Sequence, residues 1–126
     1  MSSPADYLRQ SLQLSEAGLL REALTPLHVG LGLFPENPEL WHEKYRLLKR
    51  LGSPEAYSAL IECRRVAPHY LPALKSYYEE LLRQQRLREA YQVLEEVLAQ
   101  DPENPRWWAH KAFWAMYFGN RDAAEE

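Results

Sequence analysis

Apolar residues recur every three or four positions along most of the chain, a spacing that places them on one side of an α-helix. Over residues 38–50 this stripe contains Trp41, Tyr45 and Leu48, and after a break at Gly52 a new stripe begins at Ala56. The alternation of apolar and polar residues that is typical of strands is absent. The pattern therefore predicts pairs of helices joined by short turns.

The same pattern returns at a nearly constant interval. Pro35-Glu36-Asn37-Pro38 recurs 67 positions later as Pro102-Glu103-Asn104-Pro105. Pro68 lies between the two copies, 33 residues after Pro35 and 34 before Pro102. Large residues follow the same period, at Tyr7, Trp41, Leu74 and Trp108. Self-similarity at this interval is the signature of a repeat protein built from helical hairpins.

Residues at the expected helix ends support the pairing. Side-chain acceptors precede proline at Ser3-Pro4, Asn37-Pro38, Ser53-Pro54 and Asn104-Pro105, the arrangement that starts helices. Gly18, Gly52 and Gly119 are expected to end the first helix of a pair in the left-handed conformation, and Gln85 takes this position in the third unit. Pro26 falls inside a predicted helix and is expected to bend or shorten it.

The chain resembles the tetratricopeptide repeat family in these columns. The third unit matches through Leu74, Tyr77, Tyr78, Leu81, Ala90, Leu94 and Pro102, and the fourth through Trp108, Lys111, Ala112, Ala115, Gly119 and Ala124. The resemblance implies an all-α fold, a right-handed superhelical solenoid of antiparallel helix hairpins with about three and a half repeats. We expect one domain over residues 1–126, with repeats at approximately 4–37, 38–70, 71–104 and an incomplete 105–126.

Composition narrows the function classes. Hydrophobic residues make up 46% and charged residues 26%, the balance of a folded soluble protein. The formal net charge of -3 provides no overall positive field for nucleic acid, so we expect no nucleic-acid partner. Neither a signal peptide nor a run of apolar residues long enough to cross a bilayer is apparent, so we expect no membrane insertion and a cytoplasmic location.

Motifs for catalysis are missing. The sequence has no phosphate-binding glycine loop, no GxSxG elbow and no HExxH pair, and its four histidines are scattered singly. Cys63 is the single cysteine and cannot form an internal disulfide. We therefore expect no enzyme activity, no cofactor and no metal site.

The resemblance also implies where a partner would bind. In this family the first helices line the concave surface, through residues one, five and eight positions after the large residue that opens each helix. With adjoining residues of the same helices, this peptide-binding groove consists of Leu8, Leu12, His42, Arg46, Lys49, Arg50, Lys75, Glu79, Leu82, Arg83, Arg106, Phe113, Met116 and Tyr117. The groove is then apolar at one end, basic in the middle and aromatic at the other end.

These expectations favour a protein-interaction adaptor or scaffold. Its partner would be a protein or peptide segment with acidic residues between apolar anchors. Some family members bind the C-terminal carboxylate of heat-shock chaperones through lysine and asparagine side chains. Leu8, Leu12 and Glu43 stand at the matching positions here, so we expect no such clamp.

Two alternatives remain open at this stage. Aromatic residues crowd the segment from Trp107 to Phe118, more than a solvated terminal helix should carry. Either the chain continues beyond Glu126, or a homodimer shields this segment, which would make the protein a self-associating module. The less favoured alternative is a helical-repeat protein that binds single-stranded RNA.

Overall fold

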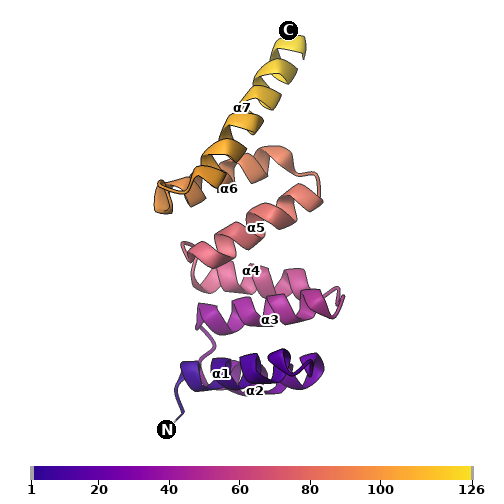
Figure 1. Cartoon of the computed structure of the whole chain (residues 1–126), viewed down its shortest axis with the longest axis vertical. Coiled ribbons are helices and arrows are strands. Elements are labelled where there is room, and N and C mark those ends of the chain that lie inside the picture. The colour runs from indigo at the N-terminus through magenta and orange to yellow at the C-terminus, as the bar shows by residue number, and fades with distance from the viewer. Residues whose placement is uncertain (1, 126) are drawn as a thin grey trace. The chain divides into compact units, whose positions relative to one another are not determined.

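The computed structural model describes the chain from residue 2 to residue 125, and its side chains from residue 2 to residue 121. The described part consists of helices and turns, without strands (Figure 1). Its seven helices are α1 (Pro4–Glu16), α2 (Leu20–Leu33), α3 (Pro38–Arg50), α4 (Ala56–Val66), α5 (Leu71–Arg83), α6 (Leu87–Gln100) and α7 (Pro105–Glu125). The predicted all-α fold is confirmed. None of the described helices is both long enough and apolar enough to cross a membrane.

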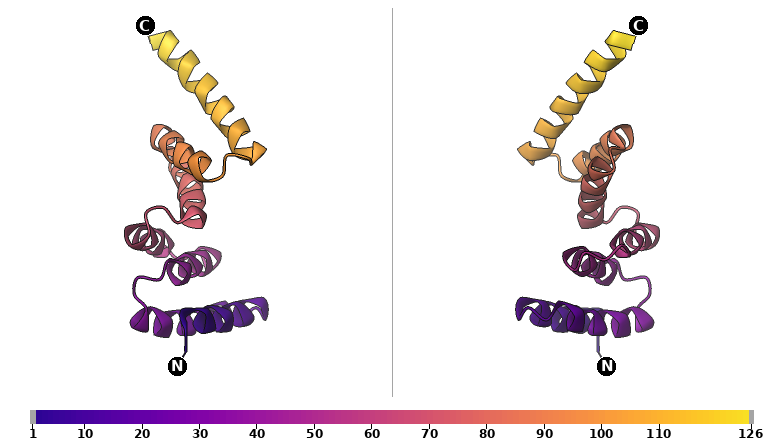
Figure 2. Two further views of the ribbon diagram at one scale, coloured as in Figure 1. Left: turned by 90° about the vertical axis from the view of Figure 1, so that its left-hand side faces the viewer. Right: turned by 90° about the vertical axis from the view of Figure 1, so that its right-hand side faces the viewer.

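The chain forms two compact units, Met1–Ala73 and Leu74–Glu126. In the first unit, α1 pairs with α2 and α3 pairs with α4, while α2 packs against α3 (Figure 2). The second unit contains most of α5 together with α6 and α7.

The core of the first unit is a layer of small and branched residues between the hairpins. Its buried members are Ala23, Leu27, Leu31, Leu40 and Leu47. Burial of each leucine side chain contributes roughly 1.5–3 kcal/mol. The layer requires close backbone approach at Gly30 in α2, where an added Cβ would lie 2.9 Å from Cβ of Tyr7 and 3.1 Å from Cδ1 of Leu40.

Three turns between paired helices share one hydrogen-bond pattern. At Gly18, its N–H donates to the carbonyl of Ser15, and the next N–H, of Leu19, donates to that of Leu14. This pair of bonds is the Schellman motif, which needs a residue with positive φ. Gly52 repeats it with φ +72°, and Gln85 repeats it with φ +59°. The expected turn position of Gln85 is therefore confirmed.

Helix starts follow the predicted caps at Ser3, Asn37 and Asn104 and differ at Ser53. The side-chain oxygen of Asn37 accepts from the backbone N–H of Leu40 at 3.0 Å, with Pro38 as the first residue of α3. Asn104 similarly accepts from the N–H of Arg106 at 3.0 Å. Ser53 and Pro54 instead form a separate turn, and α4 begins only at Ala56.

One further expectation was wrong, at Gly119, and of the two effects expected of Pro26 the shortening is absent. Gly119 does not end a helix, because α7 continues through it to Glu125; the ring of Phe118 packs against Tyr91 of α6 and holds the helix at this point. Pro26 does not shorten α2, which has 14 residues, as does α6. An internal proline costs about 3 kcal/mol; here its ring is buried, and the packing of α2 on α1 and α3 offsets the lost hydrogen bond.

The second unit keeps the predicted register of α7, since Trp108 bonds to the carbonyl of Pro102 as Trp41 bonds to that of Pro35 at 2.8 Å. Trp107 is buried at 3% exposure, whereas Trp108 is 48% exposed. Trp107 lies two residues after Pro105, as the buried Leu40 lies two after Pro38. Trp108 instead donates its indole N–H to the carbonyl of Pro102 at 2.6 Å, at the edge of the helix.

Candidate functional site

The surface that α5 and α7 share in the second unit is organised around the hydroxyl of Tyr78. This side chain is fully buried on α5. Its oxygen accepts a hydrogen bond from the indole Nε1 of Trp114 at 2.8 Å and lies 2.8 Å from Nδ1 of His110, both on α7. The rings of Tyr78 and Trp107 meet edge to face at 6.0 Å. These contacts fix the two helices side by side.

The protonation of His110 follows from its surroundings. Burial, and then the nearby charge of Arg106, lower the pKa of His110, while Glu79 opposes them. A neutral imidazole is therefore favoured at neutral pH. Since the Tyr78 oxygen already accepts from Trp114, its own proton is available for Nδ1 of His110, with the imidazole proton on Nε2.

Above this network lies an open apolar pocket of about 290 Å³. Its walls are Leu82 of α5 and Ala109, His110, Phe113 and Trp114 of α7. Phe113 is 59% exposed although its ring contacts the indole of Trp114 at 4.9 Å. A pocket of this size can hold one apolar side chain of a partner or a few of its atoms.

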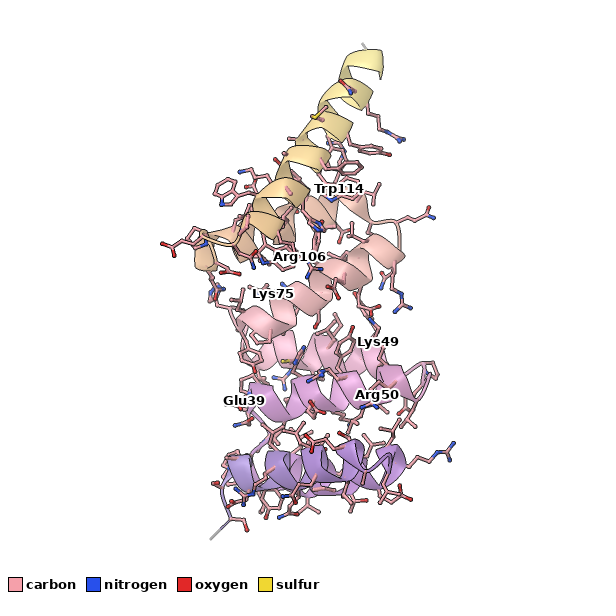
Figure 3. The ribbon with its side chains drawn as sticks, in the orientation of Figure 1. Glu39, Lys49, Arg50, Lys75, Arg106 and Trp114 are labelled. Carbon is pink, nitrogen blue, oxygen red and sulfur yellow. The ribbon has the colours of Figure 1, made fainter. Side chains whose placement is uncertain are left out.

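Two ion pairs lie near the ring of Trp107, one exposed and one half-buried. Arg106 lies 3.8 Å from Glu79 and its guanidinium lies over the ring of Trp107. Lys75 pairs with Asp101 at 3.4 Å, and hydrogen bonds from Asn104 and Lys75 lower the pKa of that carboxyl. Lys75 lies on α5, and Arg106 and Trp114 lie on α7 (Figure 3).

Arg83 at the end of α5 also has a carboxylate partner, since it lies 3.0 Å from Glu80. The basic character expected in the middle of the groove is thus reduced by local ion pairs. An exposed pair such as Arg106 with Glu79 contributes only about 0–1 kcal/mol, so a carboxylate of a partner can compete for Arg106.

In the first unit, the expected site residues of α3 form a separate cluster. The ring of His42 stacks on Tyr45 and meets Tyr70 edge to face. Burial, with help from Arg46, lowers the pKa of His42 to about 4. Lys49 donates to the hydroxyl of Tyr45 at 3.3 Å.

Arg46 is an exposed charged group of this cluster with a carboxylate partner. Its guanidinium lies 3.3 Å from the carboxylate of Glu43, which is buried. Burial raises the pKa of Glu43, against the effect of Arg46 and Arg50. On α1, Leu8 packs partly buried against the core and Leu12 is half-buried. These two leucines therefore contribute mainly to packing.

The expected site residues thus fall into groups. Leu82 and Phe113 share the pocket, and Glu79 joins Arg106 beside it. Met116 is exposed farther along α7, and Tyr117 lines a different pocket on the side of α7 that faces α6. His110 and Trp114 were missed as site residues. Their spacing of four on one helix face could have grouped them with the pocket.

Comparison with known proteins decides the family. A sequence model described as tetratricopeptide repeat matches residues 46–112 and 81–126. The chain belongs to the tetratricopeptide repeat family. No curated protein matches it in sequence.

Solved structures share this tetratricopeptide fold at low sequence identity. The first TPR of Spaghetti (RPAP3) bound to the HSP90 peptide SRMEEVD is 20% identical with a TM-score of 0.75, over 92% of this chain and 95% of that one. The NMR structure of the first TPR domain of human RPAP3 is 20% identical with a TM-score of 0.71, over 96% and 98%. PilF of Pseudomonas aeruginosa is 20% identical with a TM-score of 0.73, over 92% of this chain but 54% of that one.

Proposed function

We propose that this tetratricopeptide chain is an adaptor that binds a segment of another protein, and that the pocket between α5 and α7 takes an apolar side chain of that segment. The observation that carries the proposal is the exposure of Phe113 at the mouth of a pocket whose floor is held by hydrogen bonds. Binding hot spots of protein interfaces usually consist of a well-packed apolar pocket with polar or charged residues around it.

The charges beside the pocket favour acidic residues in the partner. Arg106 and Lys75 are held over Trp107, which restricts their side chains before any partner arrives. Carboxylates of the partner can exchange with those of Glu79 and Asp101 at little net change in ion pairing. We include Arg46, Lys49 and Arg50 of α3 as further candidate contacts for carboxylates, and Leu8 and Leu12 as candidate apolar contacts.

The peptide bound to the first TPR of Spaghetti (RPAP3), SRMEEVD, also combines carboxylates with apolar residues, which supports this class of ligand. We do not extend the HSP90 peptide itself to this chain. By the family resemblance, Leu8, Leu12 and Glu43, which is buried, are expected at the positions that receive a terminal carboxylate. Glu43 would repel it.

The test starts from a random peptide library displayed on phage and selected on the whole chain. We expect enriched peptides to carry an aromatic or long aliphatic residue next to Asp or Glu. Phe113→Ser should weaken their binding by about tenfold or more, as expected for a central contact. Leu33→Ser is the matched control, because Leu33 is 60% exposed on α2. Equal binding of the peptides to both variants would refute the site.

Self-association is the second candidate function, and it rests on α7. Phe113 and Met116, at 68% exposure, present apolar surface that a second copy would cover. Light scattering across a concentration series tests this candidate. A rise in mass that Met116→Gln abolishes would support it, and a monomer at the highest concentration would exclude it.

We also retain the remaining expectations as proposals. Residues 1–126 act as one tetratricopeptide repeat domain, located in the cytoplasm and without enzyme activity. The test of the first point is the unfolding transition, since one domain predicts that both units unfold together.

A further inference from the structure

The hydroxyl of Tyr78 makes the polar contacts below the α5–α7 pocket depend on a single proton. This hydroxyl is fully buried, and it has one hydrogen to donate. Trp114 donates to its oxygen at 2.8 Å, since an indole N–H cannot accept. The hydroxyl hydrogen is therefore left for Nδ1 of His110, also at 2.8 Å, which accepts it only while the imidazole is neutral.

Protonation of His110 reverses this last bond. An imidazolium carries a hydrogen on each ring nitrogen, so Nδ1 becomes a donor toward an oxygen that already accepts from Trp114. If the oxygen of Tyr78 accepts both bonds, its own hydrogen loses its acceptor inside a fully buried site. A buried donor without an acceptor is unfavourable. The network therefore cannot keep its present hydrogen bonds once His110 gains a proton.

The charged groups nearest to His110 act on it in opposite directions. Arg106, one turn earlier on α7, disfavours a second positive charge, and Glu79 of α5 favours it. The two form an ion pair with each other at 3.8 Å, which reduces their net effect. Lys111, the next residue of α7, pairs with Glu95 of α6 at 3.9 Å.

A further ion pair lies beyond the neighbouring ring. Lys75 pairs with Asp101 at 3.4 Å and lies over the ring of Trp107, whose centroid is 5.6 Å from that of His110. With these charges paired, burial has the largest effect, and it lowers the pKa of His110 below the ordinary value of 6.5. The imidazole is therefore neutral at pH 7 and gains its proton in acid.

His110 also forms part of the wall of the apolar pocket, together with Leu82, Phe113 and Trp114. An apolar side chain that enters the pocket covers the imidazole. Covering a neutral ring costs little, whereas covering an imidazolium removes water from a charge. The rearranged hydrogen bonds act in the same direction, because His110 and Trp114 are both positioned by the hydroxyl of Tyr78.

We propose that His110 is a proton switch of the α5–α7 pocket: the neutral imidazole keeps the pocket in its binding form, and the imidazolium releases the apolar side chain of the partner. This inference rests on the proposed function, because it concerns the regulation of the same site. The chain then holds its partner segment at neutral pH and releases it on acidification.

The first measurement uses the whole chain without a partner, followed by NMR from pH 7.5 to pH 5. We expect the indole N–H signal of Trp114 to shift with the same midpoint as the Cε1–H signal of His110. His110→Asn keeps an acceptor near the position of Nδ1 but does not titrate, so the Trp114 signal should stay constant in this variant. His28→Asn, on α2 of the first unit, is the matched control and should leave the shift unchanged.

The second measurement is the affinity, over the same pH range, of a library peptide that loses binding in Phe113→Ser. The Asp and Glu side chains of such a peptide stay mostly ionised there, because their ordinary pKa values are near 4. We expect the dissociation constant to rise by roughly tenfold for each pH unit below the midpoint of His110, and by less than about twofold in His110→Asn.

The contrary results distinguish the switch from the proposed function. A Trp114 signal that does not follow the titration of His110 would overturn the switch. A peptide that depends on Phe113 but binds equally at pH 7.5 and pH 5, or weakens equally in His110→Asn, would overturn the switch and leave the proposed function standing. Peptides that bind Phe113→Ser as well as the unchanged chain would instead refute the proposed function, and the switch with it.

Discussion

Trp114 of α7 donates its indole N–H to the buried hydroxyl of Tyr78 on α5, at 2.8 Å. This bond joins the two helices that form the candidate site, and it sets the floor on which the exposed ring of Phe113 stands. The pocket is therefore formed before a partner binds.

Trp114→Phe tests the role of this bond. The variant removes the donor but keeps an aromatic ring, and we expect a loss of about 1–2 kcal/mol in the free energy of unfolding. Tyr78→Phe and the double variant complete a thermodynamic cycle by urea denaturation. A coupling energy near zero between the two positions would show that the bond does not contribute to stability.

Close approach at Gly30 gives a second prediction. Gly30→Ala places a Cβ 2.9 Å from Tyr7, so it should lower the midpoint of thermal unfolding by the equivalent of about 1–3 kcal/mol. Gly32→Ala in the same helix has nothing within 4 Å of its added Cβ. This control should raise stability by roughly 0.5–1 kcal/mol, because alanine favours helix. Equal effects of the two substitutions would contradict the packing of α2.

The third turn offers a stabilising substitution. Gln85 has a φ of +59°, which glycine adopts more readily. Gln85→Gly should raise the free energy of unfolding by about 0.5–1 kcal/mol. Gly52→Ala, in the equivalent turn, should lower it by a similar amount. A destabilised Gln85→Gly would mean that side-chain contacts of Gln85 outweigh its backbone conformation.

Acid should weaken the fold partly through His42. Its folded pKa, about 4, is below the ordinary value of 6.5, so the unfolded chain binds the proton more readily between these values. The contribution of His42 to the free energy of unfolding is fully present above pH 6.5. It decreases as the pH drops toward 4, by roughly 3 kcal/mol in total. Glu43, whose pKa is raised, acts in the opposite direction.

His42→Phe keeps the ring against Tyr45 and Tyr70 while removing the titration. Urea denaturation between pH 7 and pH 4 should show a shallower loss of stability in this variant than in the unchanged chain. Identical pH dependence of the two would contradict the assignment to His42.

The helical hairpins could be predicted from the sequence because the residues that mark their turns and helix starts act locally. The period of the prolines and the turn positions Gly18, Gly52 and Gln85 depend on backbone chemistry that each unit repeats. The errors lie where tertiary packing decides. Gly119 is compatible with either a turn or a helix, and contacts of Phe118 with α6 favour the helix.

The candidate site shows the same limit. Leu82 and Phe113, which share the pocket, were predicted by counting positions after the large residue that opens each first helix. The same counting did not predict His110 or Trp114. Both contribute through the hydroxyl of Tyr78, which lies 32 and 36 residues away in sequence. The counting also overestimated the free positive charge, because ion pairs such as Arg106 with Glu79 form between helices.

In the proposed complex, an apolar residue of a partner enters the pocket between α5 and α7. The direct measurement is a ¹H–¹⁵N NMR titration of the chain with a peptide selected from the library. We predict the largest shifts at the indole N–H of Trp114 and the backbone amides of His110 and Phe113, with the indole signal of Trp41 as an internal reference. Shifts confined to α1 and α2, with the Trp114 indole unmoved, would contradict the account.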